Sequence, residues 1–389
     1  MTGAATGARA PVASITPEGN KDVKLQRLGI LAGIALTATV ALAACGTDSN
    51  SDKPSSTNTA SAASCPSGTL NAAGSTAQAN AVAEWIKDYN SQCANVKINY
   101  NANGSGAGQQ AFIQGTVDFA GSDSPLVPAD QTSANTHCGT GPAIHLPMVV
   151  GPIAVVTNVS GAKDLQFKAS TLAGIFAGKI TTWNDPAIAA DNPGVTLPST
   201  KITAVHRADS SGTTDNFTKY LGTVAPTVWT APHDKVWPTS AAGDAETGSD
   251  GISKEITSTD GSIGYVEWSF ATLNSLNTAK IYNGAGEWST LSADSAGKTI
   301  AGAKTTGTGD DLQMSIDYST NTAGAYPIVL VTYEIVCDKG TPAAALPLVK
   351  SFLTYTSSTA GQSSLTQLGY APLPETLRTK VASIVSNLS

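Results

Sequence analysis

Two long, almost entirely apolar segments, one in each half of the chain, constrain the fold most strongly. Residues 146–157 read LPMVVGPIAVVT and residues 326–336 read YPIVLVTYEIV. Both are rich in β-branched residues, and neither has the alternation of a strand with one face in water, so both are predicted to be buried strands. A sheet that contains them must therefore be covered on both faces.

Shorter strands and helices alternate around these segments. Strands are predicted at 68–72, 96–100, 117–120 and 202–206, and helices at 108–115, 171–177, 185–190, 213–221, 343–356 and 375–386. Such alternation indicates an α/β fold in which helices cover a sheet. We interpret the two apolar segments as strands that cross between two lobes. The first lobe is predicted to contain residues 66–156 plus 326–389, and the second residues 157–325.

The N-terminal region has the pattern of a bacterial lipoprotein signal. Basic residues between positions 21 and 27 precede the uncharged stretch 28–44, which ends in Leu-Ala-Ala before Cys45. This order predicts a leader and signal peptide over residues 1–44 and lipidation of Cys45. A plain signal peptide or a short anchor is the alternative, although a spanning helix usually needs about 20 apolar residues. Residues 45–65 contain no large apolar side chain and are predicted to be a flexible tether.

The net charge excludes some classes of partner. Without residues 1–44 the chain loses four of its 22 Lys and Arg residues and two of its 29 Asp and Glu residues, so the net charge is −9. An acidic chain with no basic run is not expected to bind nucleic acid or anionic lipid headgroups. Any anion that it captures must be held by local groups.

The cysteines also indicate export. Besides Cys45 the chain has Cys65, Cys93, Cys138 and Cys337, an even number that suits disulfides in an oxidising compartment. Three pairings are compatible with the sequence. We favour Cys65–Cys93, which flank one predicted strand–helix unit, together with Cys138–Cys337. Metal ligation is disfavoured because no two of these cysteines have CxxC spacing; we expect neither metal nor cofactor.

Three short Gly/Ser/Thr segments each precede a predicted helix: AGST at 73–76, which Val82, Trp85, Ile86 and Tyr89 follow at helical spacing, GSGAG at 104–108 and SSGT at 210–213. A helix start exposes unpaired N–H groups and the positive end of the helix dipole, and glycine lets an anion approach the backbone. A single such segment is more often an ordinary capped turn. Three of them in one chain, one beside Arg207, favour an oxyanion site.

Two acids are associated with this candidate site. The guanidinium of Arg207 is a planar fork that matches phosphate oxygens, and Asp209 is placed to pair with it, although a surface Arg–Asp pair is the alternative. Asp123, in DFAGSDSPL, can only accept a hydrogen bond when ionised. Phosphate keeps a proton near neutral pH and sulfate does not, so an acid at this position favours phosphate.

These segments resemble the phosphate-binding subunit of the bacterial phosphate importer, the PstS family. The resemblance is carried by AGST, NGSGAGQQAFIQGTVDFAGSDSPL, GIFAGKITTWNDPAI, HRADSSGTT and IGYVEWSFA, in order from about Thr69 to Leu388. It implies a two-lobed, type II-like periplasmic-binding-protein fold, in which each lobe is a mixed sheet flanked by helices and two hinge strands join the lobes. Ser75 departs from the family, in which a small apolar residue is common at this position.

The resemblance also implies a ligand and partners. Inorganic phosphate is expected between the lobes, dehydrated, in a protein that is a monomer, not an enzyme, and that serves the permease subunits of an ABC importer. The phosphate ligands carried over by position are Thr76, Ala77, Ser105, Asp123, Arg207, Ser211, Gly212 and Thr213, with Asp209 as the acid that pairs with the arginine.

Other functions remain as alternatives. An exported hydrolase would use Ser211 or Ser105 with His206, but GSGAG is not the GxSxG elbow of a serine nucleophile. A binder of another oxyanion, such as sulfate, and a phosphate sensor that does not deliver its ligand are the remaining alternatives.

Overall fold

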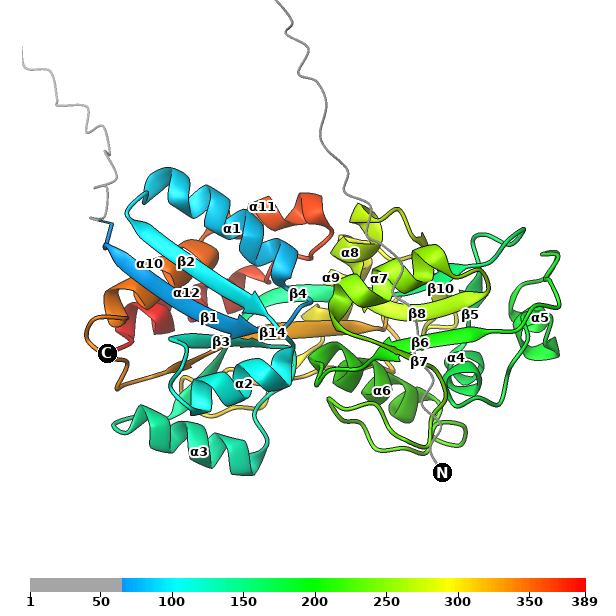
Figure 1. Ribbon diagram of the computed structural model, residues 1–389, viewed down its shortest axis with the longest axis horizontal. Helices are drawn as coiled ribbons and strands as arrows, with labels where there is room; N and C mark the ends of the chain where they lie inside the picture. The colour runs from blue at the N-terminus through cyan, green and yellow to red at the C-terminus, as the bar shows by residue number, and fades with distance from the viewer. Residues whose placement is uncertain (1–64) are drawn as a thin grey trace, which may run out of the picture. The chain divides into compact units, whose positions relative to one another are not determined.

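The long strand β4 (Ala143–Asn158) runs through the centre of the structure. It contains the first apolar segment and is buried along almost its whole length. Its first part pairs antiparallel with β14 (Val329–Cys337), and its last part pairs antiparallel with β8 (Ser262–Glu267). One strand therefore belongs to both halves of the sheet (Figure 1).

The computed structural model describes residues 65–389. The predicted signal peptide, the predicted lipidation site Cys45 and nearly all of the predicted tether lie outside the described residues. Within 65–389, no helix is long and apolar enough to cross a membrane.

The mixed sheet has the strand order β2-β1-β3-β14-β4-β8-β6-β7, and β9 also pairs with β4. Its remaining strands are β1 (Gly68–Gly74), β2 (Val96–Ala102), β3 (Phe119–Ser122), β6 (Thr203–Arg207), β7 (Asp244–Glu246) and β9 (Asn277–Thr278). β1 runs parallel to β2 and β3, β6 runs parallel to β7 and β8, and β14 is antiparallel to both of its neighbours. The first lobe thus carries β2, β1, β3 and β14, and the second carries β8, β6 and β7.

Helices lie on both faces of each lobe (Figure 1). Those of the first lobe are α1 (Ala79–Gln92), α2 (Ser105–Ile113), α3 (Pro128–Cys138), α10 (Leu346–Thr356), α11 (Thr359–Leu365) and α12 (Glu375–Asn387), with the 3-10 helix η1 (Thr366–Leu368). The others are α4 (Ala169–Phe176), α5 (Pro186–Asp191), α6 (Gly212–Val224), α7 (Gly248–Ser258), α8 (Trp268–Leu273) and α9 (Ala293–Ala301). The predicted two-lobed α/β fold is confirmed.

Two small sheets complete the second half of the chain. One contains β5 (Gln166–Phe167), β10 (Lys280–Tyr282) and β11 (Trp288–Ser289), and the other contains β12 (Lys304–Thr305) and β13 (Met314–Ser315). The second predicted apolar strand, 326–336, begins later in the structure, at Val329, and residues 326–328 precede β14. They are tied to β4 by two hydrogen bonds, from Ile153 N to Ile328 O at 2.8 Å and from Tyr326 OH to Ile153 O at 2.8 Å.

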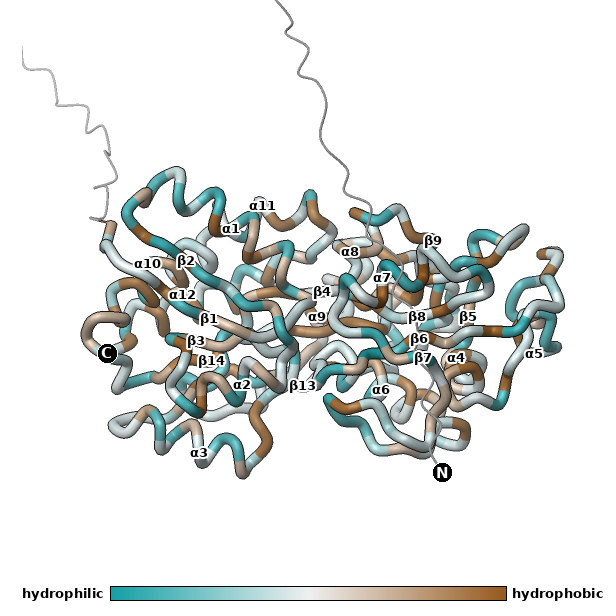
Figure 2. Tube along the Cα trace, viewed as in Figure 1, coloured by the Kyte–Doolittle hydropathy of each residue, from teal (hydrophilic) through white to brown (hydrophobic). Residues whose placement is uncertain are grey.

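The buried apolar side chains form a large cluster that includes the core of the second lobe, a second cluster in the first lobe and a small third one under α2 and α3, and hydrophobic stretches run along the central strands (Figure 2). Trp85 is fully buried in the first lobe and Trp183 in the second. Their indole N–H groups are not left unsatisfied, since they donate to Gly361 O at 2.7 Å and to Gly261 O at 2.9 Å. Burial of each large apolar side chain contributes about 1.5–3 kcal/mol to folding. The buried apolar side chains therefore stabilise the fold of each lobe.

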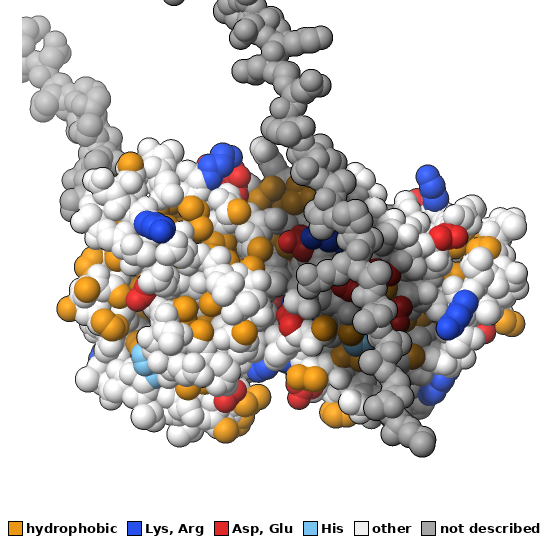
Figure 3. All heavy atoms as spheres, in the orientation of Figure 1, with side chains coloured by type: hydrophobic (Ala, Val, Ile, Leu, Met, Phe, Trp, Pro, Cys, Tyr) orange, Lys and Arg blue, Asp and Glu red, His pale blue; other side chains and the backbone are white. Residues whose placement is uncertain are grey.

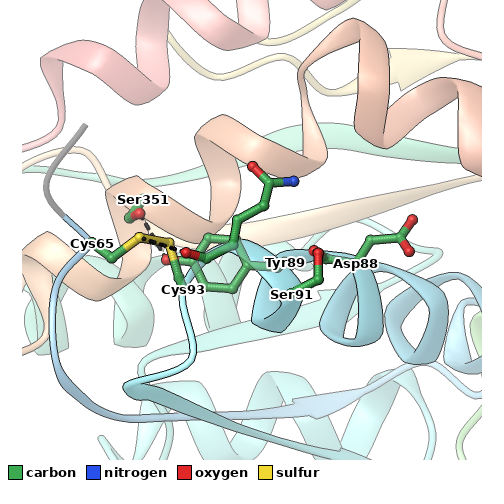
Figure 4. Close-up of a disulfide and its surroundings, with 7 residues drawn as sticks. Cys65, Asp88, Tyr89, Ser91, Cys93 and Ser351 are labelled. Carbon is green, nitrogen blue, oxygen red and sulfur yellow. Dashed lines mark hydrogen bonds between the residues drawn. A yellow bond between two sulfur atoms is a disulfide. The ribbon is translucent and has the colours of Figure 1, made fainter. Parts of the chain in front are cut away.

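Two disulfides reinforce the first lobe, and both pairings favoured from the sequence are present. Cys65–Cys93 joins the segment before β1 to the end of α1, next to the 2.7 Å hydrogen bond between Tyr89 and Ser351 (Figure 4). The second bond joins the ends of α3 and β14, which lie 199 residues apart in the sequence. Each such crosslink typically stabilises a fold by about 2–4 kcal/mol, mainly by restricting the unfolded chain.

Candidate anion-binding site

Two of the three Gly/Ser/Thr segments start helices, and the structure brings these two into contact. The first segment, 73–76, does not start α1 as the sequence suggests, because the N-cap of that helix is Gln78. Ser105 is the first residue of α2, and Ser211 is the N-cap of α6, where its hydroxyl accepts a hydrogen bond from Thr214 N at 3.3 Å. Gly212 follows Ser211, and a Cβ added to it would lie 2.6 Å from Ser105 Oγ and 2.6 Å from the Cβ of Asp123. Only glycine permits this close approach between the starts of α2 and α6.

Asp123, directly after β3, lies at the centre of this cluster and is 3% exposed. Thr332 donates to its Oδ1 at 2.7 Å, and Thr213 donates to its Oδ2 at 3.4 Å. Its backbone N–H donates to Ser105 Oγ at 3.1 Å, and its carbonyl accepts from Asn216 at 2.8 Å. The carboxyl group is therefore held by both lobes, through β14 and α6.

Opposing effects act on the ionisation of Asp123. Burial raises its pKa above the ordinary value. Hydrogen bonds from Ser75, Thr332 and Thr213 and the positive charge of Arg207 act in the opposite direction and favour the carboxylate. A carboxylate that already accepts several hydrogen bonds from the protein is oriented to accept another from a ligand.

Arg207, the last residue of β6, supplies buried positive charge beside Asp123. Its guanidinium donates through Nε to Asp209 Oδ1 at 2.7 Å and through Nη2 to Asp209 Oδ2. Burial opposes ionisation of Asp209, but the hydrogen bonds and charge of Arg207 and the N–H of Gly248 hold its pKa below the ordinary value. On the face shown in Figure 3, by contrast, Lys and Arg side chains stand singly and form no basic area.

The first Gly/Ser/Thr segment lies before α1, with Thr76 and Ala77 both buried. Thr76 Oγ1 contacts Ser249 Oγ at 2.9 Å, and Ala77 N donates to Ser75 Oγ at 3.0 Å. Ser249 belongs to the first turn of α7, so this contact spans the two lobes. Gly248–Ser249 is a fourth helix start of the same composition, and it was not predicted although Thr247-Gly248-Ser249 carries the same signal in the sequence.

Close backbone packing explains the glycines of the GSGAG segment. A Cβ at Gly108 would lie 2.4 Å from the Cα of Gly74, and a Cβ at Gly106 would lie 2.1 Å from Ser210 Oγ. Gly106 N also donates to Ser210 O at 3.0 Å. The start of α2 therefore packs tightly both on β1 and on the turn that precedes α6.

The candidate site is enclosed. None of its non-glycine side chains is more than 6% exposed: Thr76, Ala77, Ser105, Asp123, Arg207, Ser211 and Thr213. An open depression of about 820 Å³ lies elsewhere, between α1, α2 and the edge of β2, and it is lined by no charged residue. We favour the enclosed cluster as the ligand site, because an anion requires donors and positive charge rather than volume.

The hydrolase alternative lacks its base. His206 stacks on Trp237 with the rings 4.7 Å apart, and its Nδ1 lies 3.0 Å from Arg207 O. Ser211, the proposed nucleophile, is engaged as a helix cap instead. Within residues 65–389, no group of three His, Cys, Asp or Glu residues is arranged to hold a metal ion.

Comparison with known proteins matches this geometry to a family. Residues 59–359 match the family model described as the PBP superfamily domain. Phosphate-binding protein PstS 3 of Mycobacterium leprae is 42% identical over 373 residues, which cover 94% of this chain and 100% of that protein. Phosphate-binding protein PstS of Xylella fastidiosa is 35% identical over 305 residues, which cover 76% of this chain and 79% of that protein. The chain belongs to the PstS family.

Members of the PstS family are substrate-binding proteins of a transporter, so this chain is a binding protein and not an enzyme. Solved structures agree on the fold. The periplasmic phosphate-binding protein PfluDING, bound with phosphate, has a TM-score of 0.66 at 23% identity, over 81% of this chain and 93% of that chain. The phosphate-binding protein of Stenotrophomonas maltophilia has a TM-score of 0.63 at 20% identity, over 82% and 94%. This PstS-family chain thus has the two-lobed periplasmic-binding-protein fold.

Proposed function

We propose that this chain captures inorganic phosphate between its two lobes and delivers it to the permease subunits of an ABC importer. The observation that carries the proposal is the buried junction of Arg207, Asp123 and the helix starts of α2 and α6. Arginine supplies positive charge, the helix starts supply N–H donors, and the acid supplies an acceptor. The proposed phosphate ligands are Thr76, Ala77, Ser105, Asp123, Arg207, Ser211, Gly212 and Thr213.

Each group has a proposed role. Gly212 and Thr213 open α6, so their N–H groups precede the first internal hydrogen bonds of the helix and are free to donate to phosphate oxygens. Ser105 and Ser211 add hydroxyl donors, and Arg207 adds a charge-assisted contact. Asp209 fixes the arginine and does not touch the ligand.

Asp123 accounts for the choice of phosphate over sulfate. Phosphate retains a proton near neutral pH, and Asp123 accepts the hydrogen bond that this proton makes. Sulfate has no proton to donate, so its binding leaves a buried carboxylate facing a second anion. A site built to pair with a ligand donor rejects an analogue that lacks the donor.

Capture requires the lobes to open. We propose that the lobes comprise residues 66–156 plus 326–389 and residues 157–325, with a hinge near 155–157 and 325–328. Their separation would break the contacts that span them, such as Thr76 with Ser249, and expose the site to solvent. Closure would exclude water from the ligand.

The binding domain acts on the extracytoplasmic side of the cell membrane, the location of the family. We further propose that lipid on Cys45 holds the protein at the membrane, that residues 45–65 form a tether, and that the protein is a monomer. The two disulfides are consistent with an oxidising compartment.

Calorimetric titration of the protein without its signal peptide tests the function. We expect one phosphate per chain and sulfate binding at least about a hundredfold weaker. Equal affinities for phosphate and sulfate would make the protein a general oxyanion binder, and absence of phosphate binding would refute the proposal.

A further inference from the structure

Two tyrosine hydroxyls hold the turn that carries Thr76. Tyr100 OH donates to Ser75 O at 2.8 Å, and Tyr370 OH donates to Ala77 O at 2.7 Å. Both carbonyls that flank Thr76 are therefore fixed from outside the turn. The direction in which the turn presents its donors depends on these two hydrogen bonds.

Gln78 supports the first of these tyrosines. Its Nε2 donates to Tyr100 OH at 3.0 Å, because the hydroxyl proton of Tyr100 is already given to Ser75 O. This fixes the orientation of the amide. Gln78 Oε1 is then a buried acceptor, and within the described part of the chain no group donates to it.

Glu334 provides a second buried acceptor next to this amide. It lies on β14 opposite Gly121 of β3, is 1% exposed, and has no hydrogen-bond partner for Oε2 among residues 65–389. A Cβ added to Gly121 would lie 2.0 Å from Gln78 Nε2, so the amide covers the strand position beside Glu334. Two unsatisfied acceptors thus belong to neighbouring side chains.

One proton satisfies both acceptors. An ionised Glu334 and the oxygen of Gln78 can only accept, so neither can donate to the other, and Glu334 Oε2 and Gln78 Oε1 both stay unsatisfied at a cost. A neutral Glu334 has an O–H group that can donate to Gln78 Oε1. The hydrogen bonds then run in one direction, from Glu334 through Gln78 and Tyr100 to Ser75 O.

We propose that Glu334 is a positioning residue for phosphate binding, that it acts in its neutral form, and that loss of its proton lowers the affinity for phosphate. Glu334 does not touch the anion; it acts through Gln78 and Tyr100 on the turn that carries Thr76. The inference rests on the proposed function of this site.

The electrostatic environment of Glu334 supports a neutral acid. Burial raises its pKa to about 8, the neighbouring Gln78 amide opposes the shift, and the charge of Asp123 adds to it. Thr332 lies two residues earlier on the same face of β14 and donates to Asp123. Tyr100 of β2 is the other titratable group that faces Glu334, and burial raises its pKa well above the ordinary value.

The charged groups of the remaining neighbouring elements are engaged elsewhere. On β4, His145 packs edge-on against Tyr333, which points to the opposite face of β14. On α6, Asp215 accepts a hydrogen bond from Ser124 at 2.5 Å. On α9, Lys298 pairs with an acid of its own helix at the surface.

Glu267 is linked to the second tyrosine, Tyr370, through Ser269. Its Oε2 accepts from Ser269 N at 2.9 Å and from Ser269 Oγ, and this hydroxyl contacts Tyr370 OH at 3.0 Å. Burial raises its pKa to about 8, and it too is influenced by the charge of Asp123. Any alkaline loss of affinity therefore contains a contribution from each acid, and single variants are needed to separate them.

The difference between the pKa of Glu334 in the free and in the phosphate-bound protein sets how strongly the phosphate affinity depends on pH. Bound phosphate adds negative charge near Glu334 and raises its pKa further, so the affinity must fall as pH rises through about 8. Each unit of difference between the pKa in the free and in the bound protein corresponds to about a tenfold change in affinity.

The test is the phosphate affinity of the full protein, measured by calorimetry between about pH 6.5 and pH 9.5. Glutamine at position 334 is neutral throughout and still offers an N–H to Gln78. Over this pH range, the factor by which the phosphate affinity of Glu334→Gln falls is expected to be at least about ten times smaller than the factor for wild type. Glu375→Gln, at an exposed position at the start of α12, is the matched control and should follow wild type.

Equal pH profiles for wild type and Glu334→Gln would overturn the inference. If that variant does not fold, Tyr100→Phe provides the second test, because it removes the hydroxyl that transmits the effect to Ser75. Weaker binding by Tyr100→Phe at about pH 6.5, with a shallower pH profile, supports the inference, and wild-type affinity with a wild-type profile refutes it. No binding by wild type at any pH would refute the proposed function instead.

Discussion

Replacing Asp123 by asparagine tests why an acid belongs in an anion site. The substitution keeps the shape of a side chain that is 3% exposed. Oδ1 can still accept from Thr332, as it does now at 2.7 Å, while the amide nitrogen takes the place of Oδ2, which Thr213 and Ser105 approach at 3.4 and 3.5 Å. The variant therefore turns a donor toward the ligand and removes one negative charge.

The two ligands should respond in opposite directions. Phosphate loses the acceptor for its proton, and a desolvated donor left without a partner costs about 1–3 kcal/mol. Sulfate gains an N–H donor and no longer faces a like charge. Together these changes are worth about 3 kcal/mol in relative affinity, so the preference of Asp123→Asn for phosphate over sulfate should fall more than about a hundredfold.

Competition by sulfate against labelled phosphate measures this preference in wild type and variant side by side. Asp294→Asn, at a surface position whose side chain is 81% exposed, controls for the loss of a charge and should leave the preference unchanged. If Asp123→Asn rejected sulfate as firmly as wild type does, Asp123 would not be the discriminating group.

Four other perturbations test the ligand contacts, the hinge, the anchor predicted from the sequence and the buried acids. Arg207→Ala should weaken phosphate binding by roughly 3–5 kcal/mol in calorimetry, because it leaves Asp209 and the ligand without their buried partner. Arg207→Lys should retain only part of the wild-type affinity, since lysine lacks the planar fork. Full affinity in the alanine variant would show that Arg207 is not a phosphate ligand. Small-angle scattering should show a smaller radius of gyration with phosphate than without it, and an unchanged radius would contradict hinge closure. Cys45→Ser should release the protein from the membrane fraction into the medium, and a variant that stayed membrane-bound after cleavage of its leader would contradict lipid anchoring. Because burial raises the pKa of Glu267 from 4.5 to about 8, as it does that of Glu334, these acids ionise first in the unfolded chain, and Glu267 alone should lower the free energy of unfolding by a few kcal/mol as pH rises from about 4.5 to about 8. Glu267→Gln should flatten this decline in thermal unfolding, and an equally steep decline would mean that Glu267 is not the group responsible.

Local sequence signals predicted two helix starts of the candidate site, which depend on short-range structure. The helix starts at Ser105 and Ser211 carry Gly, Ser and Thr because these residues cap helices and permit close approach. The start of α2 came three residues earlier than predicted, because Gly104 adopts a φ of +97° and serves as its N-cap. Boundaries of this kind depend on a single backbone conformation, which residue periodicity does not report.

Contacts that depend on the tertiary fold were not predictable in the same way. Thr332 and Glu334 lie inside an apolar segment, where the sequence indicated only a buried strand. Thr332 becomes a partner of Asp123 because β14 pairs with β3, which brings together residues 209 positions apart. A polar residue in a buried strand therefore needs a partner that the linear sequence does not identify.

The charges around the site indicate why the protonation of two nearby buried acids, Glu267 and Glu334, should affect anion binding. With Arg207 positive and with Asp123 and Asp209 negative, the empty site already carries one net negative charge, and phosphate adds more. Binding must then depend on directed donors at helix starts, since the chain as a whole is also acidic. Ionisation of both Glu267 and Glu334 would bring the site to three net negative charges in a region shielded from water, where such charges interact most strongly. We therefore expect phosphate binding at the proposed site to require that these two acids stay protonated.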